Sequence, residues 1–149
     1  MELETGLGER FFLVTQNVDG LHRRAGHSPG RVAAVHGDIE LLRCDHHSPP
    51  RLWPHLAELP LEDPFVGGDP DFLRCTECGA LARPHVLWFD ECYNEHQYRA
   101  SSVEAFAKEA DAVLVVGTAL ETAMAASFVQ DSLRKGLLVV ECNLEQVIK

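Results

Sequence analysis

The stretch Asp111-Ala-Val-Leu-Val-Val-Gly117 decides the fold class of this 149-residue chain. A near-continuous apolar run that ends in glycine is typical of a buried strand in a parallel sheet. The next segment is helical, since its apolar residues fall on one helix face: Ala125, Phe128, Val129 and Leu133. Gly136 then predicts the helix end, and Leu137-Leu-Val-Val140 closes a strand–helix–strand unit. The sequence therefore predicts an α/β fold with a parallel sheet.

Two apolar runs nearer the N-terminus, Phe11-Phe-Leu-Val14 and Val32-Ala-Ala-Val35, predict two further buried strands. Each is followed by a small polar cluster, Thr15-Gln-Asn17 after the first and His36-Gly-Asp38 after the second. Polar residues that follow parallel strands are typical of a ligand crevice. Between the two strands, residues 19–26 predict a short helix that ends in glycine.

The second half of the chain adds another strand and helix before the unit described first. Val86-Leu-Trp-Phe89 predicts a short buried strand. One amphipathic helix is expected from about Glu95 to Ala110, because its apolar residues recur at helical spacing.

Residues 44–80 differ from the rest of the chain. Six of the eight prolines lie between Pro49 and Pro70, and proline removes backbone donors and disfavours helix in the preceding residue. We expect a loop-rich insertion without regular core structure. The predicted organisation is a Rossmann-like domain formed by residues 1–43 and 81–149, with residues 44–80 as a small inserted module.

Charge and composition exclude several classes of function. Thirteen basic against 23 acidic residues give a formal net charge of −10, which disfavours general nucleic-acid binding and membrane-surface binding. No apolar run approaches the roughly 20 residues that span a bilayer. The N-terminus lacks the pattern of a signal peptide. We expect a soluble, cytoplasmic protein.

Five cysteines form an odd set that does not favour a disulfide framework. Cys75-Thr-Glu-Cys78 has the spacing that lets two thiolates converge on one metal ion. Cys92 and Cys142 are expected to be packed thiols without a reactive role.

Blocks of sequence in a fixed order carry a resemblance to one family. They are Thr15-Gln-Asn-Val-Asp-Gly-Leu-His-Arg-Arg-Ala-Gly26, His36-Gly37, Arg83-Pro-His-Val-Leu-Trp-Phe-Asp-Glu91, Val115-Val-Gly-Thr-Ala-Leu120 and Val140-Glu-Cys-Asn143. With these blocks the chain resembles the sirtuins, the NAD-dependent protein lysine deacylases. The resemblance implies NAD as co-substrate and an acyl-lysine protein or peptide as partner.

The resemblance also implies roles for the polar residues that follow the first two strands. In the family the acyl-lysine carbonyl oxygen attacks the ribose carbon that bears nicotinamide, and a base then activates a ribose hydroxyl. His36 matches that base, and an imidazole exchanges protons near neutral pH. Gln16, Asn17 and Asp19 match the cluster around the nicotinamide ribose, with Asn17 also expected in catalysis. Asp19 is equally suited to cap the short helix.

Further residues match the family's binding positions. Gly117 and Thr118 end a strand and are expected to open a helix at the phosphate side of the cofactor. Asn143 matches a contact to the adenosine ribose, with an ordinary strand-ending Asn as the alternative. Leu87 and Phe89 match the substrate-binding strand, with plain core packing as the alternative.

The family's structural zinc site is altered in this chain. Sirtuins usually carry two Cys-x-x-Cys pairs, whereas the first pair here reads Cys44-Asp-His-His47. Cys44, His47, Cys75 and Cys78 can supply a tetrahedral Cys3His site for zinc. His46 is the alternative fourth ligand, and loss of zinc is the alternative to the site itself.

Other departures from the family bear on activity. Asp90 and Ala119 replace a usual Gly and Ser, and Thr122 and Met124 replace Val and Pro. No counterpart of the family's N-terminal glycine-rich NAD loop or final helix is found, so we expect a chain truncated at both ends, with an exposed apolar sheet face. The leading hypothesis is a sirtuin-type deacylase. The alternatives are mono-ADP-ribosyl transfer, a non-catalytic zinc-bearing fragment that binds a partner or NAD weakly, and a poorly folding remnant.

Overall fold

The computed structural model describes residues 2–54 and 73–148. The chain divides into two compact units, Met1–Ala100 and Ser101–Lys149. The middle of the predicted insertion, residues 55–72, lies outside the described residues. None of the helices in the described ranges has the length and apolarity that a membrane span requires.

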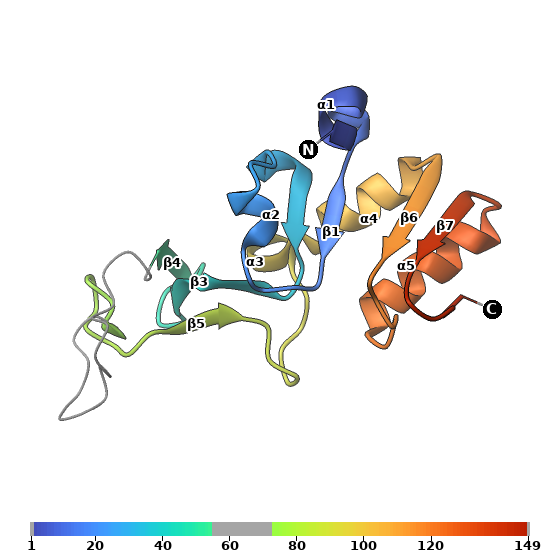
Figure 1. The fold of residues 1–149 in the computed structure, drawn as a ribbon. Coiled ribbons are helices and arrows are strands. Elements are labelled where there is room, and N and C mark those ends of the chain that lie inside the picture. Colours follow the sequence, from blue (N-terminus) through green and yellow to red (C-terminus); the bar gives the residue numbers. More distant parts are fainter. Residues whose placement is uncertain (1, 55–72, 149) are drawn as a thin grey trace. The chain divides into compact units, whose positions relative to one another are not determined.

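The first unit begins with short helices around a parallel strand pair (Figure 1). Its first elements are α1 (Glu2–Leu7), η1 (Gly8–Arg10), β1 (Leu13–Thr15), α2 (Leu21–Arg24), η2 (Pro29–Arg31) and β2 (Val32–Ala34). β1 and β2 pair in parallel, with Leu13 opposite Val32 and Thr15 opposite Ala34. The two predicted strands and the short helix between them are therefore confirmed. The polar residues that follow β1 and β2 therefore lie at the carboxyl ends of two strands that are hydrogen-bonded to each other.

An antiparallel sheet follows, in the order β4–β3–β5, which the sequence analysis did not anticipate. Its strands are β3 (Gly37–Cys44), β4 (Arg51–Pro54) and β5 (Arg83–Val86). The expectation that residues 44–80 lack regular structure is wrong for β4, which pairs with residues 41–44. Its proline is tolerated because β4 is an edge strand and Pro54 is its last residue.

The strand expected at Val86–Phe89 is also misplaced, because β5 ends at Val86. The backbone turns after it: the N–H of Glu91 donates to the carbonyl oxygen of Trp88 at 3.0 Å. The apolar residues of this segment therefore belong to a turn, and Phe89 is completely exposed.

The helix expected from Glu95 to Ala110 is divided into α3 (Glu95–Tyr98) and α4 (Ala100–Glu109). Arg99 between them has a left-handed backbone, with φ at 56°. Its guanidinium donates to the carbonyl oxygens of Pro29, Gly30 and Val32 at 3.0, 3.1 and 2.8 Å. These bonds to η2 and β2 stabilise the break, which helical periodicity alone does not reveal.

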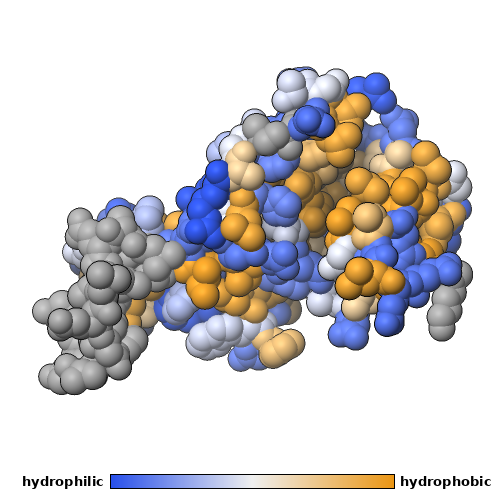
Figure 2. Space-filling model, viewed as in Figure 1, coloured by the Kyte–Doolittle hydropathy of each residue, from blue (hydrophilic) through white to orange (hydrophobic). Residues whose placement is uncertain are grey.

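The second unit contains the predicted strand–helix–strand motif. Its elements after α4 are β6 (Ala112–Val116), α5 (Ala123–Arg134) and β7 (Leu138–Cys142), and β6 and β7 pair in parallel. One face of the pair is apolar and exposed, as expected, through Leu114, Val116, Leu138 and Val140. Figure 2 shows hydrophobic side chains gathered over these strands. The opposite face packs inward with Val115, and Val129 of α5 is also buried.

Candidate functional site

His36 lies directly after β2, and hydrogen bonds hold both nitrogens of its ring. Nδ1 is 3.0 Å from the backbone oxygen of Gln16, and Nε2 is 2.9 Å from the hydroxyl of Tyr93. A carbonyl oxygen can only accept, so Nδ1 carries the proton in the neutral ring and Nε2 accepts from Tyr93. The backbone oxygen of His36 also accepts the N–H of Leu87 at 2.9 Å. The Gln16 carbonyl and the Tyr93 hydroxyl thus fix the orientation of the imidazole ring.

Tyr93 is a site residue that the sequence analysis missed. It is half-buried, and burial raises its pKa, so the phenol stays protonated at neutral pH. It follows Cys92 in a segment without periodicity, and it meets His36 across 57 residues of chain. No local pattern indicates such a contact.

The polar residues after β1 have two different surroundings. Asp19 accepts the N–H of Leu21 at 3.0 Å, so its carboxylate caps the first turn of α2, although Gly20 is the residue in the N-cap position. The N–H of Asn17 donates to Thr15 Oγ1 at 3.1 Å. Asn17 and Asp19 line a cavity of about 310 Å³, whereas His36 is not among its lining residues. The structure therefore brings Gln16 to His36 through its backbone, and places Asn17 and Asp19 at a cavity wall.

The second unit brings Gly117, Thr118 and Asn143 together. The N–H of Thr118 donates to Asn143 Oδ1 at 3.0 Å, and Asn143 Nδ2 donates back to the Thr118 oxygen at 3.0 Å. The expectation that Gly117 and Thr118 open a helix is wrong, because α5 begins at Ala123. The amide side chain of Asn143 satisfies the Thr118 backbone, so the loop after β6 is tied to the end of β7.

The candidate substrate residues lie in the turn after β5. Phe89 is completely exposed, which rules out core packing for this side chain, whereas Leu87 is half-buried. The turn is closed on its other side by Glu91, whose carboxylate Oε2 accepts the N–H of Trp88 at 2.8 Å. An exposed aromatic ring on a fixed turn is available to a partner.

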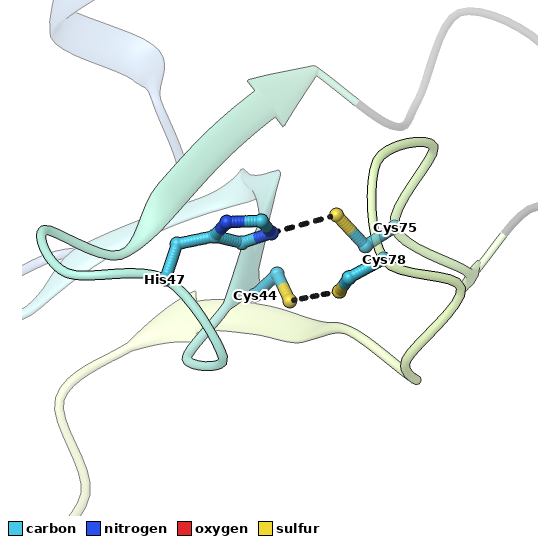
Figure 3. Close-up of side chains that lie close together, drawn as sticks. All are labelled: Cys44, His47, Cys75 and Cys78. Carbon is cyan, nitrogen blue, oxygen red and sulfur yellow. Dashed lines mark hydrogen bonds between the residues drawn. The ribbon is translucent and has the colours of Figure 1, made fainter.

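Four metal-ligating side chains converge at the end of β3 and in the turn after Leu73 (Figure 3). The ligand atoms of Cys44, His47, Cys75 and Cys78 all lie within 4.8 Å of one another. Cys44 Sγ is 3.6 Å from Cys78 Sγ, and His47 Nε2 is 3.3 Å from Cys75 Sγ. A tetrahedral zinc ion requires about 3.8 Å between two thiolates and about 3.5 Å between thiolate and imidazole. The donor set and its spacing therefore fit zinc.

The surroundings of the cluster are consistent with metal binding. Backbone N–H groups of Cys78 and Glu77, together with the His47 ring, lower the pKa of the Cys75 thiol to about 6. Burial raises the pKa of the Cys44 thiol to about 11, so a metal must displace that proton. The Glu77 carboxylate lies 3.8 Å from His47 Nδ1, beyond hydrogen-bond distance, and pairs with Arg51. His46, the alternative ligand, is exposed and outside the cluster.

Comparison with known proteins identifies the family. The profile of the Sir2 family matches residues 2–124. The chain belongs to the Sir2 family. A NAD-dependent protein deacylase of Thermus thermophilus is 40% identical over 138 residues, which are 93% of this chain and 48% of that protein. One from Pseudomonas putida is 36% identical over 91% of this chain and 49% of its own length. The chain spans about half the length of these Sir2 relatives.

Solved Sir2 structures have the same fold. A complex of a Sir2 homologue with NAD matches with a TM-score of 0.70 at 29% identity, over 93% of this chain and 48% of that one. A Sir2 complex with a p53 peptide and NAD+ matches with a TM-score of 0.71 at 26% identity, over 97% of this chain and 55% of that one. The Rossmann-like α/β fold expected from the sequence is thereby confirmed.

Proposed function

We propose that this Sir2 family member is a NAD-dependent protein lysine deacylase in which His36 is the catalytic base. The observation that supports this best is the state of the His36 ring. Its Nδ1–H is held by the Gln16 carbonyl, so Nε2 carries the lone pair of the neutral ring, and a ribose hydroxyl would replace the Tyr93 hydroxyl that Nε2 accepts in this structure. The family relatives, named as NAD-dependent deacylases, support the same reading.

Other residues take binding roles in this proposal. Gln16, Asn17 and Asp19 would face the nicotinamide ribose, with Asn17 assisting the chemistry. Bound NAD would supply the ribose carbon from which nicotinamide departs and the ribose hydroxyl that receives the acyl group.

The remaining binding roles belong to residues that follow β5, β6 and β7. Gly117 and Thr118 would lie at the phosphate side of NAD, and Asn143 would contact its adenosine ribose. Leu87 and Phe89 would contact the acyl-lysine substrate, and the complete exposure of Phe89 supports a binding role over a packing role.

We further propose that residues 44–80 are a structural zinc module inserted into a Rossmann-like domain formed by residues 1–43 and 81–149. The convergence of three thiols and one imidazole supports zinc, which would link the end of β3 to the turn at residues 75–78. A cytoplasmic location stays a prediction.

The test begins with calorimetric titration of NAD into the purified chain, with its zinc content measured, followed by a deacylase assay on acetyl-lysine peptides. We expect one-to-one NAD binding, and His36→Ala to abolish deacylation while NAD binding remains. His46→Ala is the matched control, because His46 is exposed and outside the metal cluster. A folded chain that binds zinc but neither NAD nor peptide would instead support the non-catalytic alternative.

A further inference from the structure

Two arginines face each other across the β3–β5 pair. Arg43 and Arg83 are directly opposite in the register, and their side chains are only 2% and 18% exposed. Like charges directly opposite on neighbouring strands repel, and a buried guanidinium without a partner is strongly destabilising. This part of the sheet therefore depends on the acidic groups that neutralise the two arginines.

Two carboxylates provide that neutralisation. Asp45 contacts Arg43 Nε at 2.7 Å and Arg83 Nε at 3.0 Å. Glu91 Oε1 accepts hydrogen bonds from both guanidinium groups. The hydroxyl of Tyr98, 2.6 Å from Arg43 Nη1, completes the set. Two positive and two negative charges thus form one closed cluster, in which each carboxylate bridges both arginines.

Glu91 has a second task in this cluster. While Oε1 binds the arginines, Oε2 accepts the backbone N–H of Trp88 at 2.8 Å. The guanidinium of Arg83 lies over the Trp88 ring, 4.0 Å from its centroid. The shape of the turn that presents Leu87 and Phe89 is therefore set by a carboxylate whose position the two arginines determine.

The other end of the cluster is the metal centre. Cys44 is fully buried and stands between Arg43 and Asp45 in the sequence. Its backbone pairs with Arg51 of β4, and its thiol lies among the other three ligand atoms, where zinc would hold it. A shift of Cys44 must therefore move its two sequence neighbours. Arg43 binds Glu91 directly, and Asp45 binds Arg83, which in turn binds Glu91.

We propose that Glu91 is a positioning residue that couples the metal centre to the turn at residues 87–91. The inference rests on the proposed zinc site and concerns the part of the chain proposed to contact the acyl-lysine. Binding of zinc orders Cys44, its neighbours hold Glu91, and Glu91 holds the turn. Coupling between two sites is reciprocal, so loosening the turn weakens zinc binding by the same factor.

The first test measures zinc affinity by competition with a chromophoric chelator for the wild-type chain, Glu91→Gln and Asp90→Asn. Glu91→Gln keeps the size of the side chain and removes the charge that binds both arginines. The matched control removes the neighbouring charge from Asp90, which is exposed. We expect Glu91→Gln to weaken zinc binding about tenfold, in line with other groups that support metal ligands, and Asp90→Asn to leave it unchanged. Equal affinities for all three chains would overturn the inference.

The second test needs no variant and remains valid if Glu91→Gln fails to fold. Amide hydrogen exchange of the Trp88 N–H is measured by NMR in the wild-type chain with zinc and after its removal. We expect removal to accelerate exchange at Trp88 about tenfold, while Val115 in the other unit is unaffected. A chain that binds zinc without any change at Trp88 refutes the coupling alone. A chain that binds no zinc refutes the metal site together with the inference that depends on it.

Discussion

Substituting Gly37 by alanine tests the packing that carries His36. Gly37 follows His36, and its backbone has φ at +96°, a conformation that residues with a side chain rarely adopt. A Cβ placed there would lie 2.0 Å from the carbonyl oxygen of His85 on β5. That atom belongs to the backbone of a paired strand, so no side-chain rotation can relieve the overlap.

The expected cost has two parts. The strained backbone costs about 1–3 kcal/mol for a residue with a side chain. Relief of the overlap requires β5 to move away from the start of β3, which weakens hydrogen bonds such as Leu87 N–H to the His36 oxygen, each contributing about 1 kcal/mol. We therefore expect Gly37→Ala to lower the free energy of unfolding by about 3–5 kcal/mol, a large share of the stability of an ordinary domain.

Urea unfolding followed by circular dichroism measures this difference, with Gly30→Ala as the control. An added Cβ at Gly30 has no atom within 4 Å, so that variant should lie within about 0.5 kcal/mol of wild type. The two substitutions make the same chemical change at sites that differ in backbone conformation and in the room around the added Cβ. Equal unfolding free energies for the two variants would show that the β3–β5 packing described above is wrong.

Three further predictions concern single side chains. Phe89→Ala should leave the melting temperature unchanged, since the ring is completely exposed, but raise KM for an acetyl-lysine peptide; a loss of stability without a change in KM would contradict the binding role. Tyr93→Phe should leave folding intact and change the pH profile of deacylation, because the hydroxyl 2.9 Å from His36 Nε2 is lost, and an identical profile would exclude that influence. Hydrogen bonds from Ser28 lower the pKa of Glu4 to about 2. The stabilisation from ionised Glu4 is therefore complete above its unfolded pKa of about 4.5 and is lost as the pH falls towards 2. Glu4→Gln should have a lower free energy of unfolding than wild type at pH 7 and an equal one near pH 2. A difference in unfolding free energy that stays constant with pH would contradict this assignment.

The parallel parts of the fold could be predicted because their patterns are local. The β6–α5–β7 unit and the β1–β2 pair each combine a short apolar run with a glycine or a polar cluster at its end. The spacing of Cys75 and Cys78 is equally local, whereas Cys44 and His47 were expected from the sirtuin resemblance, and the structure brings the ligand atoms of all four residues within 4.8 Å of one another. Short-range patterns therefore indicated these strands, and among the candidate metal ligands only the Cys75–Cys78 pair.

The antiparallel sheet and the division of the long helix depend on contacts between distant residues. β3 lacks a strict alternation, since three consecutive residues at its end, Leu42 to Cys44, are all buried. Arg99 interrupts the helix because carbonyl oxygens about 70 residues earlier in the chain bind its guanidinium. In both cases the deciding partner is far away in the sequence, so a window of neighbouring residues does not contain the signal.

The turn after β5 shows how such a partner overrides an apolar pattern. Residues 86–89 are all apolar and predict a buried strand, yet the backbone turns and Phe89 points into solvent. Glu91 binds two arginines on β3 and β5, and its second oxygen accepts the N–H of Trp88 within the turn. Exposing apolar side chains costs free energy, so a cluster of charges that fixes them outside the core is best explained by a partner that covers them. The proposed acyl-lysine substrate is such a partner, because this turn carries Leu87 and Phe89, which match the substrate-binding positions of the sirtuins.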